Sequence, residues 1–267
     1  MAERSKSKER LTIRIGRSTM SILVSNDDSD EVVFEPYVVK SGVSMAANLR
    51  EAFKSSDLLL QLPPRVRVMI DADVLLTPVE MFDEASMEQL HRYTFPREEQ
   101  DVVTYNVLPE LNTVAVFSVN KDLKLVLDDH FRDVRLMIIQ QPVWRHLHQR
   151  SFTGSNRKLY GYFHEKRLEL FSFQKNRFRF FNTFDAARSK DAVFFISYVW
   201  KQQGLDPEAD ELHLVGDIPD EADVLQELKR FVKKVLVINP SADFNAHPAT
   251  EVKGMPYDLM TLAVKGR

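Results

Sequence analysis

The sequence of 267 residues contains no cysteine, which excludes disulfides, thiolate metal ligands and cysteine nucleophiles together. Only 8 residues are glycine, too few for several loops that wrap phosphates through bare backbone. Neither sign of charge predominates: the net charge of −3 provides no basic excess for nucleic acid and no acidic excess typical of disorder. The longest apolar run, residues 192–200, is interrupted by Ser197 and is too short to span a membrane. We therefore expect a soluble, cytoplasmic protein.

The sequence also lacks the common catalytic signatures. It contains no Gly-x-Ser-x-Gly elbow, no phosphate-binding P-loop and no dinucleotide fingerprint. We therefore predict no catalytic residue and no bound metal from motifs alone.

A repeated pattern is the main positive signal. Three strand-like runs and a helix occupy residues 10–15, 19–25, 32–39 and 44–54. The same order returns over residues 158–163, 167–173, 177–184 and 189–202. Apolar residues alternate along the predicted strands and recur at helical spacing in the predicted helices. A duplicated unit of this kind predicts two similar α/β domains that face each other across a ligand-binding cleft.

The remaining segments complete the predicted domain organisation. We expect a disordered arm over residues 1–9, a first domain over 10–150 and a second over 151–267. Residues 150–157 have the composition of a linker. An α+β insert interrupts the first domain at about residues 76–130, with helices predicted over 85–93 and 121–130 and strands over 102–107 and 113–119.

Three short segments carry a resemblance to a known superfamily. They are residues 93–99 (YTFPREE), 214–217 (LVGD) and 257–266 (YDLMTLAVKG). With the order of elements, they resemble the actin-like ATPase superfamily, and within it the pilus-assembly ATPases and the cytoplasmic proteins of secretion platforms. As a whole, the chain resembles members of an uncharacterised bacterial family of this superfamily. The resemblance implies duplicated ribonuclease-H-like domains, each with a mixed five-stranded sheet and helices on both faces.

The resemblance also implies where a nucleotide would bind. In active members, the first hairpin of each domain carries an Asp followed by Gly and small hydroxyl residues, which hold phosphate and orient Mg²⁺ waters. Gly16, Ser18 and Thr19 match this pattern in the first hairpin, but Arg14 stands at the Asp position. The candidate nucleotide site comprises Gly16, Arg17, Ser18, Thr19, Gly216 and Asp217.

The second hairpin departs further from the pattern. Tyr162 stands at the Asp position and His164 at the Gly position, where their bulk would fill the space that a γ-phosphate needs. An Arg cannot ligate Mg²⁺, although it could pair with phosphate itself. We therefore expect no hydrolysis and no cofactor, with ATP as the one candidate ligand. Because Arg14 and Tyr162 stand at strand ends, changing both to Asp is predicted to cost little stability.

Other polar groups offer weaker alternatives. Asp71 and Asp73 follow an apolar strand and could bind a divalent metal, but we favour a polar exit from the strand and predict no metal. His146 and His148 are two residues apart on a predicted helix, so they cannot share a metal, and we place them at the surface or in a groove. His213 is interpreted as a hydrogen-bonded structural residue.

Three functions from different classes remain open. The first is a degenerate ATPase that binds a protein partner, with the insert as the contact surface. The second is an ATP-dependent enzyme in which Arg14 and Arg17 replace Mg²⁺. The third is nucleic-acid binding on a sheet where Arg177 and Arg179 share a face with Phe181. We favour the first and expect no nucleic-acid partner.

Overall fold

The structure is a computed structural model that describes residues 9–26, 29–60, 65–96 and 101–266. The chain divides into two compact units. Unit 1 comprises residues 1–143 and 247–267, and unit 2 comprises residues 144–246. These units differ from the predicted domains, since the C-terminal segment belongs to unit 1. The predicted arm over 1–9 lies outside the described residues except for Glu9, which begins the first strand.

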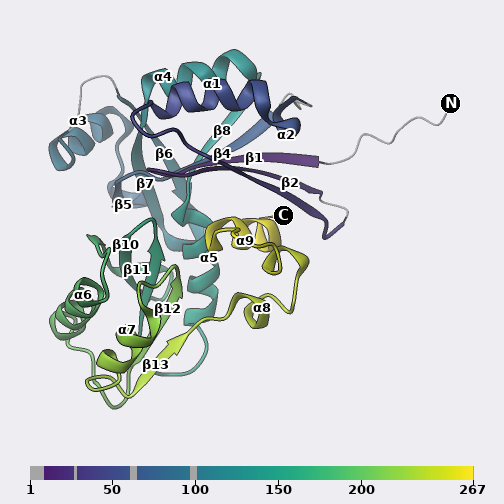
Figure 1. The fold of residues 1–267 in the computed structure, drawn as a ribbon. Coiled ribbons are helices and arrows are strands. Elements are labelled where there is room, and N and C mark those ends of the chain that lie inside the picture. Colours follow the sequence, from purple (N-terminus) through teal and green to yellow (C-terminus); the bar gives the residue numbers. More distant parts are fainter. Residues whose placement is uncertain (1–8, 27–28, 61–64, 97–100, 267) are drawn as a thin grey trace. The chain divides into compact units, whose positions relative to one another are not determined.

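Unit 1 is built on a five-stranded mixed sheet with the order β3-β2-β1-β4-β8 (Figure 1). Its strands are β1 (Glu9–Ile15), β2 (Met20–Asn26), β3 (Val32–Tyr37), β4 (Arg65–Ile70) and β8 (Asp133–Ile138). β1 pairs antiparallel with β2 and parallel with β4. The helices of this unit are α1 (Met45–Ser55), α2 (Asp57–Leu60), α3 (Glu84–Thr94), α4 (Lys121–His130) and α9 (Tyr257–Lys265). Its short 3-10 turns are η1 (Val79–Met81), η2 (Pro109–Leu111) and η3 (Pro248–Thr250).

The insert in unit 1 forms a sheet of its own. This sheet has the order β5-β7-β6 and consists of β5 (Val74–Pro78), β6 (Asp101–Leu108) and β7 (Thr113–Asn120). Both pairings are antiparallel. α4 begins after Asn120, whose side-chain oxygen accepts a hydrogen bond from Leu123 N at 3.1 Å. The predicted α+β insert is therefore present, although residues 97–99 of the motif at 93–99 lie outside the described residues.

Unit 2 repeats the main sheet of unit 1. Its strands are β9 (Lys158–His164), β10 (Arg167–Gln174), β11 (Arg177–Asp185), β12 (Glu211–Gly216) and β13 (Lys234–Val237). They follow the order β11-β10-β9-β12-β13, with antiparallel pairs at the start and parallel pairs at the end. The helices are α5 (Gln140–Ser151), which contains the boundary between the units, α6 (Ser189–Gln202), α7 (Glu221–Leu228) and α8 (Pro240–Asp243). The shared order and strand directions confirm the predicted duplication.

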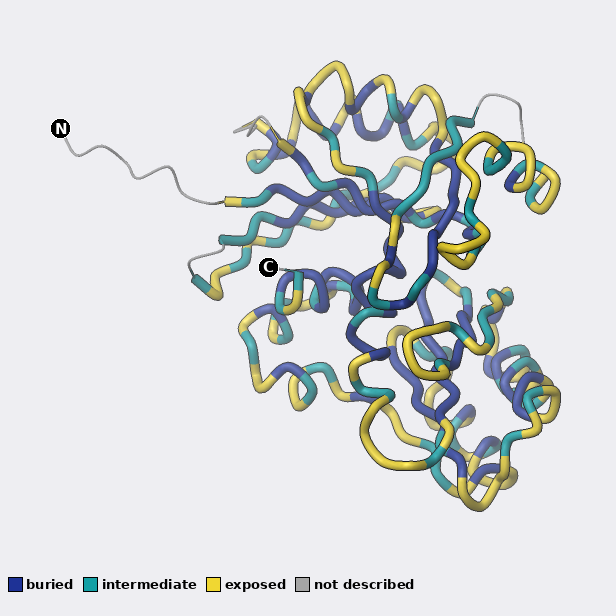
Figure 2. The backbone as a smooth tube through the Cα atoms, turned by 180° about the vertical axis from the view of Figure 1, so that it is seen from behind, coloured by how far each residue is buried: buried dark blue, intermediate teal, exposed yellow. Residues whose placement is uncertain are grey.

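Burial explains why these patterns fold as they do. β1 and β9 are central strands, and nearly all of their residues are buried (Figure 2). In unit 2, one face of the sheet packs against α6 and α7 through Ile196, Trp200 and Val224. In unit 1, Met69 and Met137 of the sheet pack against Leu259 and Leu262 of α9. Because α9 covers one face of the first sheet, it completes the core of unit 1.

Two of the helix ends are formed by residue types that are typical of helix caps. Ser44 caps α1, since its hydroxyl accepts a hydrogen bond from Ala47 N at 3.2 Å. Gly204 follows α6 with φ of +56°, as a helix stop requires. Ser189, in contrast, is the first residue inside α6, and Arg188 is the cap although serine is the better capping residue type.

Candidate functional site

The first candidate turn, residues 16–19, joins β1 to β2. Gly16 N donates a hydrogen bond to Thr19 O at 2.8 Å and closes the hairpin. Gly16 is buried, whereas Arg17, Ser18 and Thr19 are exposed. The predicted phosphate-binding residues of this hairpin therefore lie together on an accessible loop.

Arg14, which the sequence predicted at the Asp position of the first hairpin, forms a buried ion pair with Asp258 of α9. Arg14 Nε donates to Asp258 Oδ1 at 2.8 Å, and Nη2 donates to Oδ2 at 2.9 Å. The side chains are only 2% and 0% exposed. Arg14 Nη1 also donates to Thr19 Oγ1 at 3.0 Å. The guanidinium therefore ties the candidate turn to the closing helix.

This geometry corrects two predictions. Arg14 is engaged with Asp258 instead of facing an anion. A substitution of Asp for Arg14 would place two carboxylates against each other without water, and a buried pair that loses one partner typically costs about 3–5 kcal/mol. Tyr162 is also buried, with 1% exposure. The expectation that changing both residues would cost little stability is therefore wrong.

A second arginine of β1 contacts the other end of α9. Arg10 Nη1 donates to Gly266 O at 3.2 Å. Cations stabilise the carbonyl end of a helix because the last carbonyls lack intrahelical donors. Arg14 and Arg10 thus hold α9 near its beginning and at its end, across a sequence separation of about two hundred and fifty residues.

The acidic pair after β4 lies beside the candidate turn. Arg17 Nη2 donates to Asp73 Oδ1 at 2.7 Å, and Arg17 Nε lies 4.0 Å from Asp71 Oδ2. The charge of Arg17 therefore partly neutralises these two carboxylates. Within the described residues, no group of three or more His, Cys, Asp or Glu is arranged to hold a metal ion.

The second candidate turn is tighter than the first. It contains only Glu165 and Lys166, with φ of +45° and +66°, the left-handed pair of a two-residue hairpin. His164 lies next to Glu169, with 3.1 Å between Nε2 and Oε1, and both are buried. Tyr162 stacks on His164 with ring centroids 4.8 Å apart. Packed side chains fill this hairpin, as the sequence predicted.

Gly216 has a structural reason to be glycine. Its φ is +96°, and a Cβ there would lie 2.0 Å from the carbonyl oxygen of Phe163. The next residue, Asp217, donates its backbone N–H to the same oxygen at 3.0 Å. The close approach of β12 to β9 explains why residue 216 is glycine. This glycine is therefore not separate evidence for a nucleotide-binding site.

The six candidate residues fall into two groups. Gly16, Arg17, Ser18 and Thr19 belong to unit 1, whereas Gly216 and Asp217 belong to unit 2. Each group lies on the turn where the sequence placed it. A shared nucleotide cleft remains a prediction.

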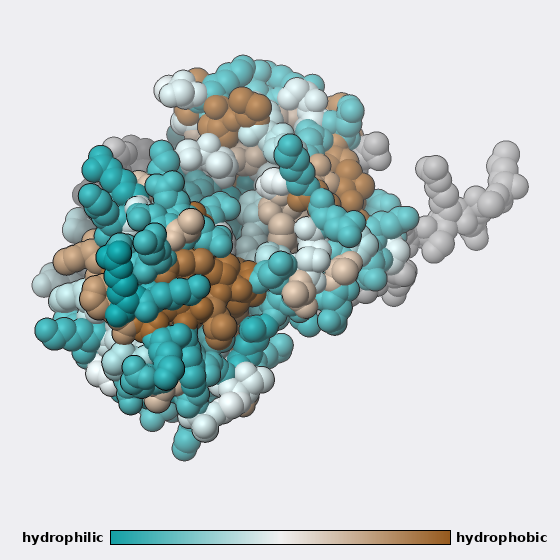
Figure 3. All heavy atoms as spheres, turned by 60° about the horizontal axis from the view of Figure 1, so that its bottom comes forward, coloured by the Kyte–Doolittle hydropathy of each residue, from teal (hydrophilic) through white to brown (hydrophobic). Residues whose placement is uncertain are grey.

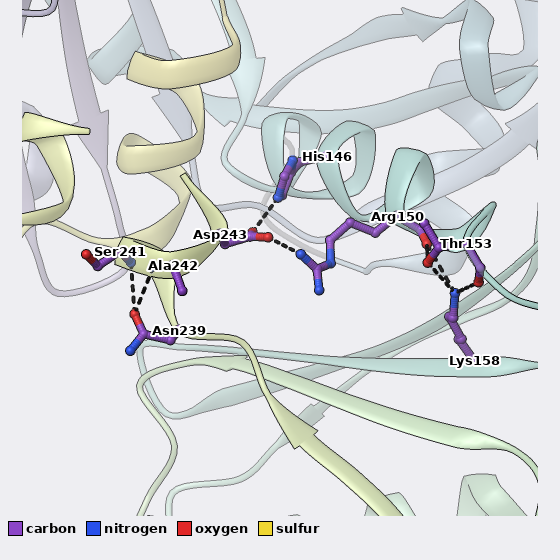
Figure 4. Close-up of polar contacts among 8 residues, drawn as sticks. All are labelled: His146, Arg150, Thr153, Lys158, Asn239, Ser241, Ala242 and Asp243. Atoms are coloured by element: carbon purple, nitrogen blue, oxygen red, sulfur yellow. Dashed lines mark hydrogen bonds and ion pairs between the residues drawn. The ribbon is translucent and has the colours of Figure 1, made fainter. Parts of the chain in front are cut away.

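A polar cluster on α5 was not anticipated. His146 Nε2 lies 2.6 Å from Asp243 Oδ2, and Arg150 Nη1 donates to Asp243 Oδ1 (Figure 4). Lys158 donates to Arg150 O at 3.2 Å, and to Thr153 O and Oγ1, which caps the end of α5. The i, i+4 spacing of His146 and Arg150 was the available signal, but only the fold shows that α8 supplies their acid.

Both helix histidines are buried, so they are not the surface residues that formed one part of the prediction. His146 is 6% exposed and His148 is 5% exposed. His148 Nε2 lies 3.0 Å from Lys175 O. Helix α5 covers one face of the sheet in unit 2, so both histidine side chains are buried by packing.

Burial shifts several ionisation equilibria next to this cluster. Desolvation raises the pKa of the Tyr160 phenol above its usual value. Desolvation likewise lowers the pKa of His213, helped by the charges of Lys158 and Arg150, although a hydrogen bond to Glu211 opposes the shift. His213 Nε2 lies 3.0 Å from Glu211 Oε2, as expected for a hydrogen-bonded structural residue.

A bulge changes the expected faces of β11. Ser172 pairs with Phe180 and Phe173 with Phe178, so Arg179 has no opposite residue in the ladder. The extra residue brings Phe178 and Phe181 to one side, where both pack edge-on against Trp144 at 5.2 and 5.1 Å. The prediction that Arg177 and Arg179 share a face with Phe181 is therefore wrong, and the proposed basic aromatic surface loses its geometric basis.

With this geometry established, known proteins can be compared. A family model described as "Protein of unknown function (DUF3822)" matches residues 2–235. The chain belongs to this family. No curated protein matches the sequence.

Solved structures establish the fold. A Bacteroides thetaiotaomicron VPI-5482 protein, described as having an actin-like ATPase fold and unknown function, is 28% identical with a TM-score of 0.83. That match covers 92% of this chain and 98% of the other. A chain of the PilM–PilN type IV pilus biogenesis complex is 12% identical, with a TM-score of 0.55 and coverage of 96% and 97%. This DUF3822 chain therefore has the actin-like ATPase fold.

A third similarity is weaker. The cytoplasmic domain of EpsL, an inner-membrane component of the type II secretion system of Vibrio cholerae, is 15% identical with a TM-score of 0.42. The match covers 83% of this chain and 93% of that domain. None of the described helices combines the length and apolar character that crossing a bilayer requires.

Proposed function

We propose that this chain is an actin-like protein that does not hydrolyse ATP and acts in the cytoplasm as a protein-binding or assembly module. The observation that carries the proposal is the buried pair of Arg14 and Asp258. Hydrolysis in this superfamily needs a carboxylate that orients Mg²⁺ waters at the first hairpin. Here both oxygens of Asp258 accept hydrogen bonds from Arg14, so the pair presents a satisfied ion pair instead of an open carboxylate.

The second hairpin supports the same conclusion. Tyr162, His164 and Glu169 are all buried and contact one another, so the hairpin is packed for stability. The alternative of an ATP-dependent enzyme needs Arg14 and Arg17 to neutralise phosphate. Arg14 is bonded to Asp258 and Arg17 to Asp73, which removes the specific support for that alternative.

Exposed apolar side chains support a protein partner. Figure 3 brings forward the side of Figure 1 where elements of unit 2 are drawn, and it shows an apolar area surrounded by hydrophilic residues there. On the insert, Met81 is 72% exposed and Tyr93 is 87% exposed. Aromatic and Met side chains are enriched at protein interfaces. The PilM–PilN structure provides a precedent for this fold within a protein complex.

Phosphate release from Mg-ATP tests the first half of the proposal. We expect no turnover above background and no Mg²⁺-dependent binding up to millimolar nucleotide in calorimetry. Ser18→Ala is the matched control, because a genuine activity at this turn would fall in the variant and a contaminant would not. Turnover that falls in Ser18→Ala would overturn the proposal.

Site-specific cross-linking tests the second half. A photoreactive side chain at position 93 should capture one partner in cells, and Met81→Glu should abolish that capture. Phe231→Glu is the matched control, since Phe231 is 61% exposed but lies in unit 2. Capture that survives Met81→Glu, or that both variants abolish equally, would reject the insert as the contact surface.

A further inference from the structure

One edge of the sheet in unit 2 is open. β11 is the last strand in the order β11-β10-β9-β12-β13, so no described strand pairs with its outer side. Ala186 N donates to Lys166 O, just before β10, at 2.8 Å, so the backbone of residue 186 faces inward. Backbone direction alternates along a strand. Phe181, Thr183 and Asp185 therefore direct their N–H and C=O groups outward.

The outward N–H of Thr183 has a local partner. It donates to the side-chain Oδ1 of Asn182 at 2.8 Å. The backbone carbonyl of a further strand can replace this oxygen, since both are amide acceptors. The bulge affects only the first half of β11, between Phe178 and Phe180. Residues 181–185 therefore form a regular edge to which another strand can be added.

Aromatic side chains continue from this edge onto the outer face of α6, which packs against β10 and β11 (Figure 1). Phe184 of β11 stacks on Phe195 with ring centroids 4.5 Å apart. Phe195 contacts Phe194 at 5.2 Å, and Phe194 stacks on Tyr198 at 6.2 Å. Phe194 is 61% exposed and Tyr198 is 49% exposed. Grouped exposed aromatic side chains of this kind are typical of protein interfaces.

The segment that forms this surface is basic although the whole chain is not. Residues 175–202, which contain β11 and α6, have six Lys or Arg residues and two Asp residues, a net charge of +4 against −3 for the whole chain. Lys190 lies four residues before Phe194 and Lys201 lies seven after it, so both exposed lysines share its helix face. The surface therefore attracts a negatively charged partner.

We infer that the outer edge of β11, together with the aromatic strip and the lysines of α6, binds an extended acidic peptide of a partner protein as an added strand. In this mode of recognition, main-chain hydrogen bonds provide affinity and alternate side chains provide specificity. An anionic membrane fits less well, because lipid headgroups do not present donors and acceptors at the regular spacing of an extended backbone. The surface belongs to unit 2, whereas the insert belongs to unit 1, so the inference goes beyond the proposed function.

Selection of random peptides displayed on phage against the full chain tests the inference. We expect the enriched sequences to be acidic, with apolar residues at alternate positions. A fluorescently labelled peptide of such a sequence should bind saturably in anisotropy titrations, and its affinity should fall as the salt concentration rises. A selection that enriches no sequence, or sequences without acidic residues, would overturn the inference.

Thr183→Pro tests the strand edge directly. Proline removes the outward N–H and obstructs a further strand, but it breaks no hydrogen bond to β10. We expect the labelled peptide to bind at least about tenfold more weakly. Circular dichroism should show that the variant is folded. Equal binding by the wild type and the folded variant would contradict strand addition.

Charge reversal on α6 provides a test that does not depend on the proline variant. Lys201→Glu should weaken peptide binding several-fold and reduce its salt dependence. Lys121→Glu is the matched control, since it reverses an exposed lysine of unit 1 and should bind like the wild type. Equal affinities of the two variants would reject the lysines of α6 as part of the site.

Two further measurements distinguish other occupants of the edge. Sedimentation with phosphatidylserine vesicles should show no binding, and ultracentrifugation of the chain alone should show no dimer that Thr183→Pro abolishes. Either positive result would assign the edge to a membrane or to a second copy and would overturn the inference. Met81→Glu should leave peptide binding unchanged, so a failure of the insert as a contact surface remains distinguishable from a failure here.

Discussion

The two hairpins that begin the duplicated units are closed in different ways. In unit 1, residue 14 of β1 reaches Asp258, which is 244 residues away in the sequence. In unit 2, the corresponding hairpin closes on itself, since His164 contacts Glu169 five residues later. The first turn has four residues, of which Gly16 is buried and the other three are exposed, whereas the second has two residues in left-handed conformation.

The first hairpin therefore has a different structural role in each of the two duplicated units. In the second hairpin, the buried polar contact at the turn is local, between His164 of β9 and Glu169 of β10. The first became the attachment point of α9, so the C-terminus of the chain completes the N-terminal unit. Long-range closure costs chain entropy, which the buried ion pair and the methionine-rich core under α9 offset.

The largest effect should come from reversing the charge at the long-range closure. Arg14→Asp should destabilise unit 1 by about 3–5 kcal/mol or more, because Asp258 would be buried against a second carboxylate. Urea unfolding followed by circular dichroism measures the loss. Tryptophan fluorescence reads unit 2 separately, because the chain has 2 tryptophans, Trp144 and Trp200, and both belong to that unit.

A double apolar variant is the control for this prediction. Arg14→Met with Asp258→Leu should recover most of the stability, since replacing both members of a buried pair is often neutral. A fully stable Arg14→Asp protein would show that α9 does not depend on the pair.

An intermediate effect is expected at the end of β12. Gly216→Ala should destabilise unit 2 by about 1–3 kcal/mol, because the added Cβ meets Phe163 O in a strained conformation. Gly204→Ala is the matched control, since Gly204 also has positive φ but nothing lies within 4 Å of its Cβ position. If both variants lose the same stability in urea, the positive φ alone explains the loss and the contact with Phe163 O does not contribute.

Acidification should weaken unit 2 in a defined pH range. The folded pKa of His213 lies below the value of 6.5 for the unperturbed group, so the unfolded chain binds more protons as the pH falls. Stability contributed by neutral His213 is present above pH 6.5 and is lost as the pH drops toward the folded pKa. Glu211 adds a further loss below its unperturbed value of 4.5, because hydrogen bonds from His213 and Asn156 outweigh its burial and lower its pKa.

His213→Gln should remove the upper part of this pH dependence. Urea midpoints from tryptophan fluorescence, taken at several pH values below 7, measure the slope. A slope near pH 6 that persists in the variant would assign it to another group.

The smallest effect is expected at the exposed arginine of the first turn. Arg17→Gln should change stability by less than about 1 kcal/mol, because the side chain is 42% exposed and its pair with Asp73 is screened by water. The same urea assay that detects Arg14→Asp should barely register it. A large loss would mean that Asp71 and Asp73 depend on Arg17 for their burial.

The sequence was sufficient for the architecture because the pattern is local. Alternation identified the first three strands of each five-stranded sheet, and helical spacing identified α4 and α6 at their observed bounds. The insert and the duplicated strand order were likewise predictable. Helix caps were less predictable, because α6 begins after Arg188 although Ser189 is the better capping residue.

The candidate nucleotide site stays a prediction, and the structure adds contacts that the sequence did not reveal. Residue types alone predicted Arg14 at the position where active members of the superfamily have Asp. They could not show that Asp258 neutralises Arg14, because the two residues meet only when α9 packs on the first sheet. For the same reason, the sequence did not reveal that His146 and Arg150 share one carboxylate, that of Asp243. Nor did it reveal the bulge that turns Phe181 toward Trp144.

Local hydrophobic periodicity therefore determined the elements and their order, since each strand or helix depends on neighbours in the chain. The tertiary structure alone decided which charges are buried and paired. Ion pairs form between groups that the sequence separates widely, and their energy depends on exclusion from water, which only the packed fold provides.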